Sequence, residues 1–151
     1  MPKKIIAVIG AGIADEAILN IAEEVGKLIA KRGAVLICGG LGGIMEAASK
    51  GAKSVGGITV GILPQNHTKD ANPYIDIPLA TGFGEGRNVI IARTADAIIA
   101  VGGEYGTLSE IAFGLKMGKP VIGIGTWDIK GIIKAKNAED AVNKAFEILS
   151  L

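Results

Sequence analysis

Short apolar runs that alternate with segments of helical period constrain the fold of this chain most strongly. Most of the runs are continuously hydrophobic rather than alternating, which is typical of strands buried on both faces of a parallel sheet. The pattern predicts an α/β fold: one doubly wound, mostly parallel Rossmann-like sheet, flanked by helices on both faces, in a single domain over residues 1–151. The predicted strands are 4–9, 34–38, 58–63, 75–79, 97–101 and 120–124.

The segments between the runs carry apolar side chains at helical spacing and predict five helices. Gly33 is the expected C-cap of the first helix, and Asn137 is the expected N-cap of the last. Residues 64–74 contain two prolines, two asparagines and the single histidine, and they predict an exposed loop. The predicted helices are 15–32, 44–54, 85–94, 107–117 and one that begins near residue 137.

Composition excludes several classes of function. The net charge is +1, so no broad field favours nucleic acid or an anionic membrane as a partner. One cysteine, Cys38, and one histidine, His67, cannot form an intramolecular disulfide or a zinc site of the usual Cys/His kind, and no metal site is predicted. No apolar stretch reaches the ~18 residues of a membrane span. We expect a cytoplasmic protein.

Glycine is the over-represented residue, with 23 of 151 residues against a usual share of roughly 7%. Three clusters, at residues 10–12, 39–43 and 102–107, each follow a predicted strand and precede a predicted helix. The glycines of a single strand-to-helix turn can be explained by the positive φ that such a turn requires. Three such turns at the carboxyl edge of one sheet place many free backbone N–H groups together, as phosphate sites do. The predicted ligand-binding residues are Gly10, Gly12, Gly39, Gly40, Gly42, Gly43, Gly102, Gly103, Tyr105, Gly106 and Thr107.

Two common phosphate-binding fingerprints are missing. The third glycine of the dinucleotide fingerprint is replaced by Asp15, and Cys38 and Gly39 stand where a ribose-binding acid is expected. No Gly-Lys-Ser/Thr sequence follows any glycine cluster. NAD binding of the usual type and ATP chemistry of the P-loop type are therefore disfavoured.

Charged residues close to the glycine clusters are few. Glu110 lies one helical turn beyond Gly106, and Glu46 follows Gly43 in the same way, so each carboxylate can point back toward a cluster. A carboxylate repels phosphate, so each either faces solvent or serves the sugar or base end of a nucleotide. Arg87 begins a predicted helix and can clamp a phosphate or pair with Glu110.

Residues 101–110, with Arg87 and Asn88 before them, resemble the PGGxGTxxE motif and the preceding Arg-Lys pair of the Lonely Guy and lysine-decarboxylase-like superfamily. The resemblance covers nearly the whole chain and is closest to a branch of small proteins similar to molybdenum-cofactor carriers. It implies a homodimer or higher homo-oligomer. Enzymes of the superfamily hydrolyse the N-glycosidic bond of nucleoside 5′-monophosphates. By this resemblance Gly102, Gly103, Gly106 and Thr107 would hold the phosphate, and Arg87 and Glu110 would be catalytic.

Two residues depart from the motif: Val101 replaces its proline, and Asn88, a further candidate ligand-binding residue, replaces its lysine and removes one positive charge. Two hypotheses therefore stay open. The chain is a phosphoribohydrolase of nucleoside monophosphates, or it is a non-enzymatic binding protein that carries a pterin such as molybdenum cofactor. Both predict a small phosphorylated ligand and no resident cofactor. Nothing marks a lysine for pyridoxal phosphate, so lysine decarboxylation is not expected.

Overall fold

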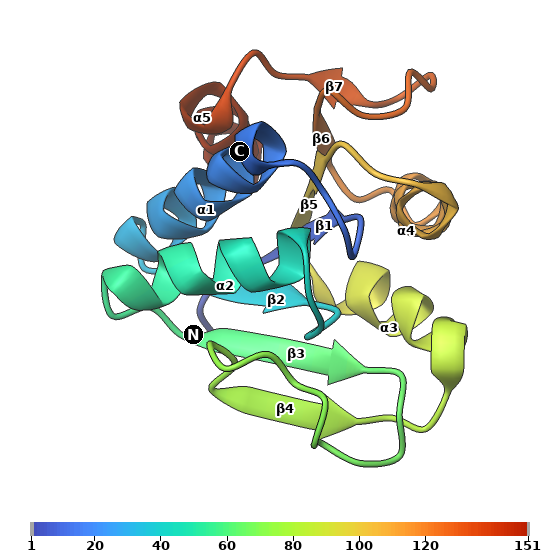
Figure 1. The fold of residues 1–151 in the computed structure, drawn as a ribbon. Coiled ribbons are helices and arrows are strands. Elements are labelled where there is room, and N and C mark those ends of the chain that lie inside the picture. Colours follow the sequence, from blue (N-terminus) through green and yellow to red (C-terminus); the bar gives the residue numbers. More distant parts are fainter. Residues whose placement is uncertain (1, 151) are drawn as a thin grey trace.

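The computed structural model describes residues 2–150 and contains one seven-stranded, entirely parallel sheet in the order β4-β3-β2-β1-β5-β6-β7 (Figure 1). This confirms the predicted fold class. The strands are β1 (Ile5–Gly10), β2 (Val35–Cys38), β3 (Thr59–Leu63), β4 (Ile77–Ala80), β5 (Ala97–Val101), β6 (Val121–Ile124) and β7 (Ile133–Lys134). The helices are α1 (Glu16–Lys31), α2 (Ile44–Ser54), α3 (Arg87–Thr94), α4 (Tyr105–Lys116) and α5 (Ala138–Leu149), with a 3-10 turn at Gly84–Gly86.

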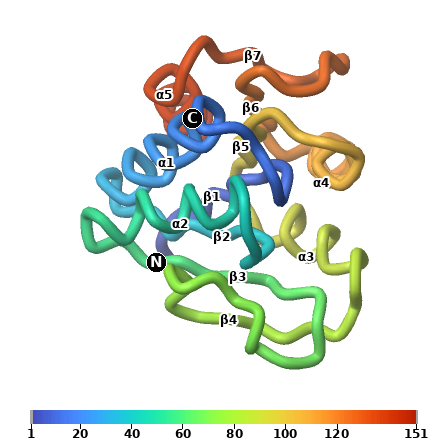
Figure 2. The backbone as a smooth tube through the Cα atoms, viewed as in Figure 1, coloured from blue at the N-terminus to red at the C-terminus, as the bar shows by residue number. Residues whose placement is uncertain are grey.

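The strand order reverses between β1 and β5, which lie side by side in the middle of the sheet (Figure 2). Strands β2, β3 and β4 follow one another on one side of β1, and β6 and β7 continue beyond β5 on the other. In doubly wound sheets, ligands bind beyond the carboxyl ends of the strands at such a switch point. The topology therefore directs attention to the ends of β1 and β5.

Successive side chains of each strand point to opposite faces of the sheet, so they pack into two separate aliphatic cores. From β1, Ile6 and Val8 pack with helices α1, α2 and α5, whereas Ala7 and Ile9 pack with α3 and α4 on the opposite face (Figure 1). Burial of a full aliphatic side chain contributes about 1.5–3 kcal/mol. The double coverage explains why the strands are hydrophobic throughout.

Two helical glycines allow α1 and α2 to cross at very short range. A Cβ atom at Gly26 would lie 1.9 Å from the carbonyl oxygen of Ala48, and one at Gly51 would lie 1.8 Å from that of Glu23. Both distances are far below van der Waals contact. Part of the glycine excess thus serves helix packing rather than the sheet edge, a use that the positions of the three glycine clusters did not predict.

Most observed elements match the predicted ones to within one residue at each end, and four differ more. Helix α3 begins at Arg87 instead of residue 85, because Gly84–Gly86 forms a 3-10 turn. Strand β7 was not predicted, because two residues leave no hydrophobic run to detect. Strand β4 is a half-exposed edge that begins at Ile77 instead of residue 75, since Ile75 N–H donates to the carbonyl of Asn72 in a turn (3.2 Å). Helix α4 begins at Tyr105 instead of residue 107, so Gly106 lies within its first turn.

Other local predictions are confirmed. Gly33 follows α1 with φ of +77°, and the Asn137 side chain accepts a hydrogen bond from Asp140 N–H at 2.8 Å as the N-cap of α5. Residues 64–74 form a mainly exposed loop. It is anchored by buried Asn72, which donates to the carbonyl of Leu41 at 2.9 Å. None of the helices within residues 2–150 combines the length and apolarity needed to cross a bilayer.

Candidate functional site

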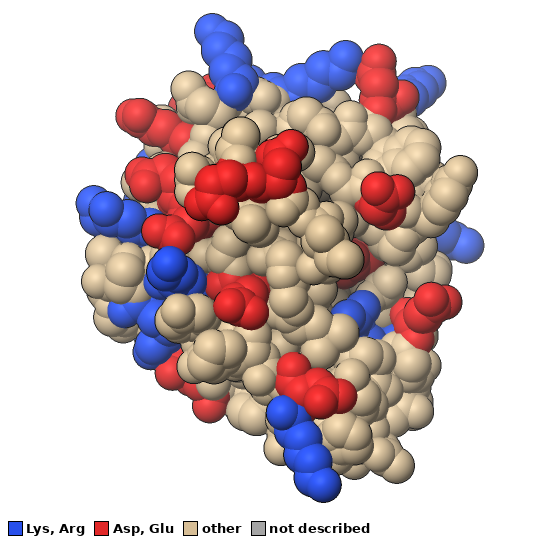
Figure 3. All heavy atoms as spheres, viewed as in Figure 1, with Lys and Arg blue, Asp and Glu red and all other residues tan. Residues whose placement is uncertain are grey.

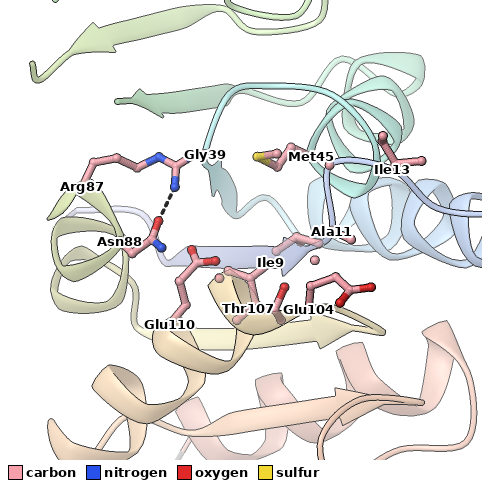
Figure 4. A pocket seen from close by; sticks show the side chains of 14 residues that line it. Ile9, Ala11, Ile13, Gly39, Met45, Arg87, Asn88, Glu104, Thr107 and Glu110 are labelled. Carbon is pink, nitrogen blue, oxygen red and sulfur yellow. Dashed lines mark hydrogen bonds between the residues drawn. The ribbon is translucent and has the colours of Figure 1, made fainter. Parts of the chain in front are cut away.

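A cavity of about 570 Å³ opens at the carboxyl ends of β1, β2 and β5, beside the switch point (Figure 4). The turn after β1, the start of α3 and the first two turns of α4 form its walls. Its lining residues are Val8, Ile9, Gly10, Ala11, Gly12, Ile13, Gly39, Met45, Arg87, Asn88, Glu104, Gly106, Thr107 and Glu110.

Arg87, the first residue of α3, is held in the cavity wall by hydrogen bonds. Its Nε donates to the carbonyl of Ile62 at 2.9 Å, and its Nη1 donates to Oδ1 of Asn88 (Figure 4). A Cβ atom at Gly39 would lie 2.6 Å from Nη2, so a larger residue there would displace the guanidinium from its present position. Burial lowers the pKa of Arg87, and the nearby Glu110 and Cys38 oppose that shift. The group stays charged at neutral pH.

Glu110 lies in the second turn of α4, only 7% exposed, with its carboxylate directed toward the cavity beside Asn88 and Ile9 (Figure 4). Burial raises its pKa to about 7, against the opposing attraction of Arg87. The two side chains are not among the ion pairs within 4.0 Å formed by residues 2–150. The carboxyl group is therefore buried, has a pKa near neutral pH and forms no ion pair within 4.0 Å with the rest of residues 2–150.

The N-terminus of α4 points at the same cavity. Its first helical hydrogen bond runs from Leu108 N–H to the carbonyl of Glu104 at 3.0 Å, which leaves the N–H groups of Tyr105, Gly106 and Thr107 without helical acceptors. No heavy atom lies within 4 Å of a Cβ built at Gly106, so this part of the helix end is open. Free N–H groups and the helix dipole together favour an anion.

Eight of the residues predicted to bind the ligand or catalyse its reaction are brought together here: Gly10, Gly12, Gly39, Arg87, Asn88, Gly106, Thr107 and Glu110. The rest of the second glycine cluster, Gly40, Gly42 and Gly43, lies outside the lining. That cluster supports the turn after β1 from behind: a Cβ at Gly43 would lie 2.3 Å from the carbonyl oxygen of Ala11, which also accepts from Ile44 N–H at 3.0 Å.

The remaining candidates face elsewhere. Gly102 and Gly103 form the positive-φ turn after β5 and do not line the cavity. Glu46 lies over a separate hollow between α1 and α2 with Glu16 and Lys50. Tyr105 is 78% exposed, lines a neighbouring hollow and packs on Trp127 with ring centroids 5.7 Å apart.

Six lining residues were not predicted as site residues: Val8, Ile9, Ala11, Ile13, Met45 and Glu104. Met45 takes the cavity-facing position that had been expected for Glu46, one residue along the same helix. Glu104 places a second carboxylate on the lining, at the N-cap position of α4. Ile13 is 92% exposed in the turn after β1. Its exposed apolar side chain beside the cavity is the feature that suggests contact with a ligand.

The sheet, its switch point and the glycine-walled cavity together define a Rossmann-like protein with a candidate anion site. The model of the SLOG cluster4 family matches residues 3–149. The chain belongs to that family, which confirms the expected relation to the Lonely Guy superfamily.

Two relatives and two solved structures show where the chain lies within the superfamily. An uncharacterized protein of Archaeoglobus fulgidus is 54% identical over 140 residues, 91% of each chain. The cytokinin riboside 5′-monophosphate phosphoribohydrolase of Mycobacterium tuberculosis is 32% identical over 120 residues, 73% of this chain and 64% of that enzyme. The chain thus matches less than two thirds of the enzyme's length.

The solved structures match along the whole chain. The molybdenum cofactor binding protein of Rippkaea orientalis is 38% identical with a TM-score of 0.94, covering 99% of both chains. The molybdenum cofactor carrier protein of Chlamydomonas reinhardtii is 36% identical with a TM-score of 0.90, covering 99% of this chain and 100% of that one. The expected likeness to molybdenum-cofactor carriers is confirmed.

Proposed function

We propose that the protein binds a small phosphorylated heterocycle of the molybdopterin class in the cavity beside the switch point. The observation that carries the proposal is the meeting of the open N-terminus of α4 with the half-buried guanidinium of Arg87 in that one cavity. The full-length likeness to molybdenum cofactor binding and carrier proteins supports the class of ligand.

A phosphate monoester fits the donors that the cavity offers. The free N–H groups at the start of α4 and the N–H groups on Nη2 of Arg87 are suited to anionic oxygens, and hydrogen bonds to charged groups contribute about 1.5–3 kcal/mol each. Glu110 opposes an anion only when ionised, and its pKa of about 7 leaves much of it neutral. The carboxylic acid can then donate a hydrogen bond to the ligand.

Departure from the enzymes favours a binding role over catalysis. Asn88 stands where their motif has lysine, so the site holds one positive charge fewer to stabilise a reacting phosphate ester. The solved carrier and binding proteins match essentially the whole chain, whereas the curated enzyme from Mycobacterium tuberculosis matches only in part. Both facts support ligand retention as the primary activity.

The test is anaerobic incubation with molybdenum cofactor released from a purified molybdoenzyme, followed by gel filtration and measurement of bound molybdenum and pterin. We expect the wild-type protein to retain both in equal amounts. Arg87→Ala should retain at least about tenfold less because it loses charge-assisted hydrogen bonds. Arg32→Ala, which removes a guanidinium at the C-terminal end of α1 and outside the cavity lining, is the control and should retain as much as wild type. Absence of pterin from the wild-type fraction would sink the proposal.

A second candidate function, hydrolysis of nucleoside 5′-monophosphates, is favoured by Arg87 and Glu110 lying on the same cavity. Water would add to C1′ of the ribose while the bond to the base nitrogen breaks, and the base would leave with a proton, giving free base and ribose 5-phosphate. Ionised Glu110 would stabilise the oxocarbenium-like transition state and orient the water.

Incubation with AMP, GMP, CMP and cytokinin riboside monophosphates, with free base measured by liquid chromatography, tests this reaction. Hydrolysis should rise with pH through about 7, because the ionised form of Glu110 is the active one. Glu110→Gln should abolish it, while Glu24→Gln, an exposed change on α1, should not. Equal base release by wild type and Glu110→Gln would remove the enzyme from consideration. The homodimer and the cytoplasmic location stay predictions.

A further inference from the structure

Asn88 lies between the guanidinium of Arg87 and the start of α4. Its Oδ1 accepts from Nη1 of Arg87, and its Nδ2 donates to the hydroxyl of Ser109 at 3.3 Å. That hydroxyl in turn donates to the carbonyl of Gly106 at 2.7 Å. Asn88 is 5% exposed, so the two hydrogen bonds of its own side chain are partly shielded from water, whereas the bond between Ser109 and Gly106 is exposed. The chain of hydrogen bonds connects the first residue of α3 to the first turn of α4.

These contacts leave one part of the guanidinium for a ligand. Nε donates to Ile62 and Nη1 to Asn88, whereas Nη2, beside Gly39, donates to no group within residues 2–150. A guanidinium is planar, so fixing Nε and Nη1 also fixes the direction of the N–H groups on Nη2. Asn88 therefore determines where the free donors of Arg87 point.

We propose that Asn88 is a positioning residue that fixes the Arg87 guanidinium relative to the N-terminus of α4, so that both donate to one phosphate. The ligand part of this inference rests on the proposed function. An asparagine suits the role because it supplies a neutral acceptor to Arg87 and a donor to Ser109. Lysine, which the enzyme motif has at this position, supplies no acceptor. Asparagine at this position thus removes one positive charge from the site and fixes the orientation of the Arg87 guanidinium.

The positioning itself is tested without ligand by the ¹⁵N spectrum of arginine side chains at low temperature. A guanidinium held at Nε and Nη1 rotates slowly, so wild type should give separate Nη signals for Arg87, identified by their loss in Arg87→Lys. Asn88→Ala should collapse them to one averaged signal, and Asn88→Asp, which keeps an acceptor, should retain them. Unchanged separate signals in Asn88→Ala would overturn the proposal.

A matched control uses a second asparagine that accepts a hydrogen bond from an arginine, Asn143 of α5, whose partner Arg32 is the C-cap of α1. Asn143→Ala should leave the Arg87 signals as in wild type. Ser109→Ala removes the link to α4 but not the acceptor, so the Arg87 signals should broaden without collapsing. Identical spectra for wild type and Ser109→Ala would contradict the connection to α4.

Affinity for GMP and for guanosine, measured by calorimetric titration, tests the consequence for a ligand. Asn88→Ala should weaken GMP binding about tenfold, as expected for misdirecting one charged donor, and leave guanosine binding unchanged. Asn88→Asp should also weaken GMP binding, because the aspartate charge partly neutralises Arg87. The Arg87 signals of this variant should stay separate. Equal GMP affinity in wild type and Asn88→Ala would refute the ligand part. If wild type binds no GMP, the second candidate function fails for this nucleotide, and the spectra still decide the positioning.

Discussion

The crossing of α1 and α2 and the cavity at the switch point use glycine for different reasons. At the crossing, Gly26 and Gly51 have backbone carbonyls within 1.9 Å of any added Cβ, so the fold itself requires glycine. At the cavity, Gly12 and Gly106 have no heavy atom within 4 Å of an added Cβ. Gly106 lies in the first turn of α4 and does not have positive φ, so alanine could adopt the same backbone conformation. A glycine that packing does not require points to something outside the chain.

The largest expected effect is at the crossing. Gly26→Ala should lower the free energy of unfolding by about 3 kcal/mol, because the new methyl group meets a backbone carbonyl that moves only if the two helices separate. Urea unfolding followed by circular dichroism measures it. A loss below about 0.5 kcal/mol would show that the crossing tolerates side chains and would erase the contrast between the two groups of glycines.

The second expected effect concerns the cavity and depends on a buried charge, that of Glu110, rather than on close packing as at the crossing. The pKa of Glu110 is raised by burial from 4.5 to about 7, so the folded state favours the protonated form and loses stability as pH rises from about 4.5 to about 7. Glu110→Gln removes this loss. It should be more stable than wild type by up to about 3 kcal/mol at pH 8 and little different near pH 4.5.

Urea midpoints at the two pH values measure this difference, with Glu24→Gln, exposed on α1, as the control. A constant difference between Glu110→Gln and wild type across the range would contradict burial as the source of the shift. The expected result would show that the cavity is maintained at the expense of stability, which is typical of functional sites.

Gly106→Ala should stabilise the protein by about 0.5–1 kcal/mol, since alanine is the better helix former and the site has room for a methyl group. The same methyl group would occupy space in front of the free N–H groups of α4, so ligand retention should fall. Thermal unfolding and cofactor retention measure the two effects. A destabilised Gly106→Ala would mean that the fold does require this glycine.

The smallest effect on stability is expected for Gly12→Ala, within about 0.5 kcal/mol, because the position is exposed and open. It lines the same cavity as Gly106, so retention of the ligand should fall here too. Loss of stability as large as in Gly26→Ala would place Gly12 among the packing glycines.

Hydrophobic periodicity predicted the layers of this fold because every strand but two short edge strands is covered on both faces. The residues that line the cavity were harder to predict from the sequence. Arg87, Asn88 and Glu110 could be placed from their spacing around the glycine motif. Which side chain of α2 faces the cavity could not, because successive residues differ by about 100° around a helix and the rotation of α2 is set by its packing on α1. Met45 faces the cavity and Glu46 does not.

The close approach of α1 and α2 was equally hidden from sequence. Gly26 and Gly51 lie inside helical patterns, where a glycine alone indicates only a lower helix propensity. Their role depends on a contact between α1 and α2, which are separated in the sequence by β2, and no local sequence pattern predicts such a contact. The hydrogen bond from Asn88 to Ser109 also joins separate helices and could be seen only once α3 and α4 were placed together.

The basic and acidic side chains on the face drawn in Figure 3 lie interspersed, so the charge that matters for a ligand is local. It consists of the half-buried guanidinium of Arg87, the N-terminal end of α4, the carboxylate of Glu104 and the carboxyl group of Glu110, whose pKa is raised to about 7. Specificity for a phosphorylated ligand would therefore be carried by a few groups in the cavity rather than by the general surface.

The most direct test is anaerobic equilibrium dialysis of molybdenum cofactor against wild type and Gly106→Ala at pH 7, with the unfolding midpoints of both proteins measured in parallel. We predict that Gly106→Ala unfolds at an equal or higher midpoint and binds the cofactor at least about tenfold more weakly, the loss expected for one obstructed charged hydrogen bond. Equal binding by the two proteins, or no binding by wild type, would contradict the claim that this glycine is open for a phosphate.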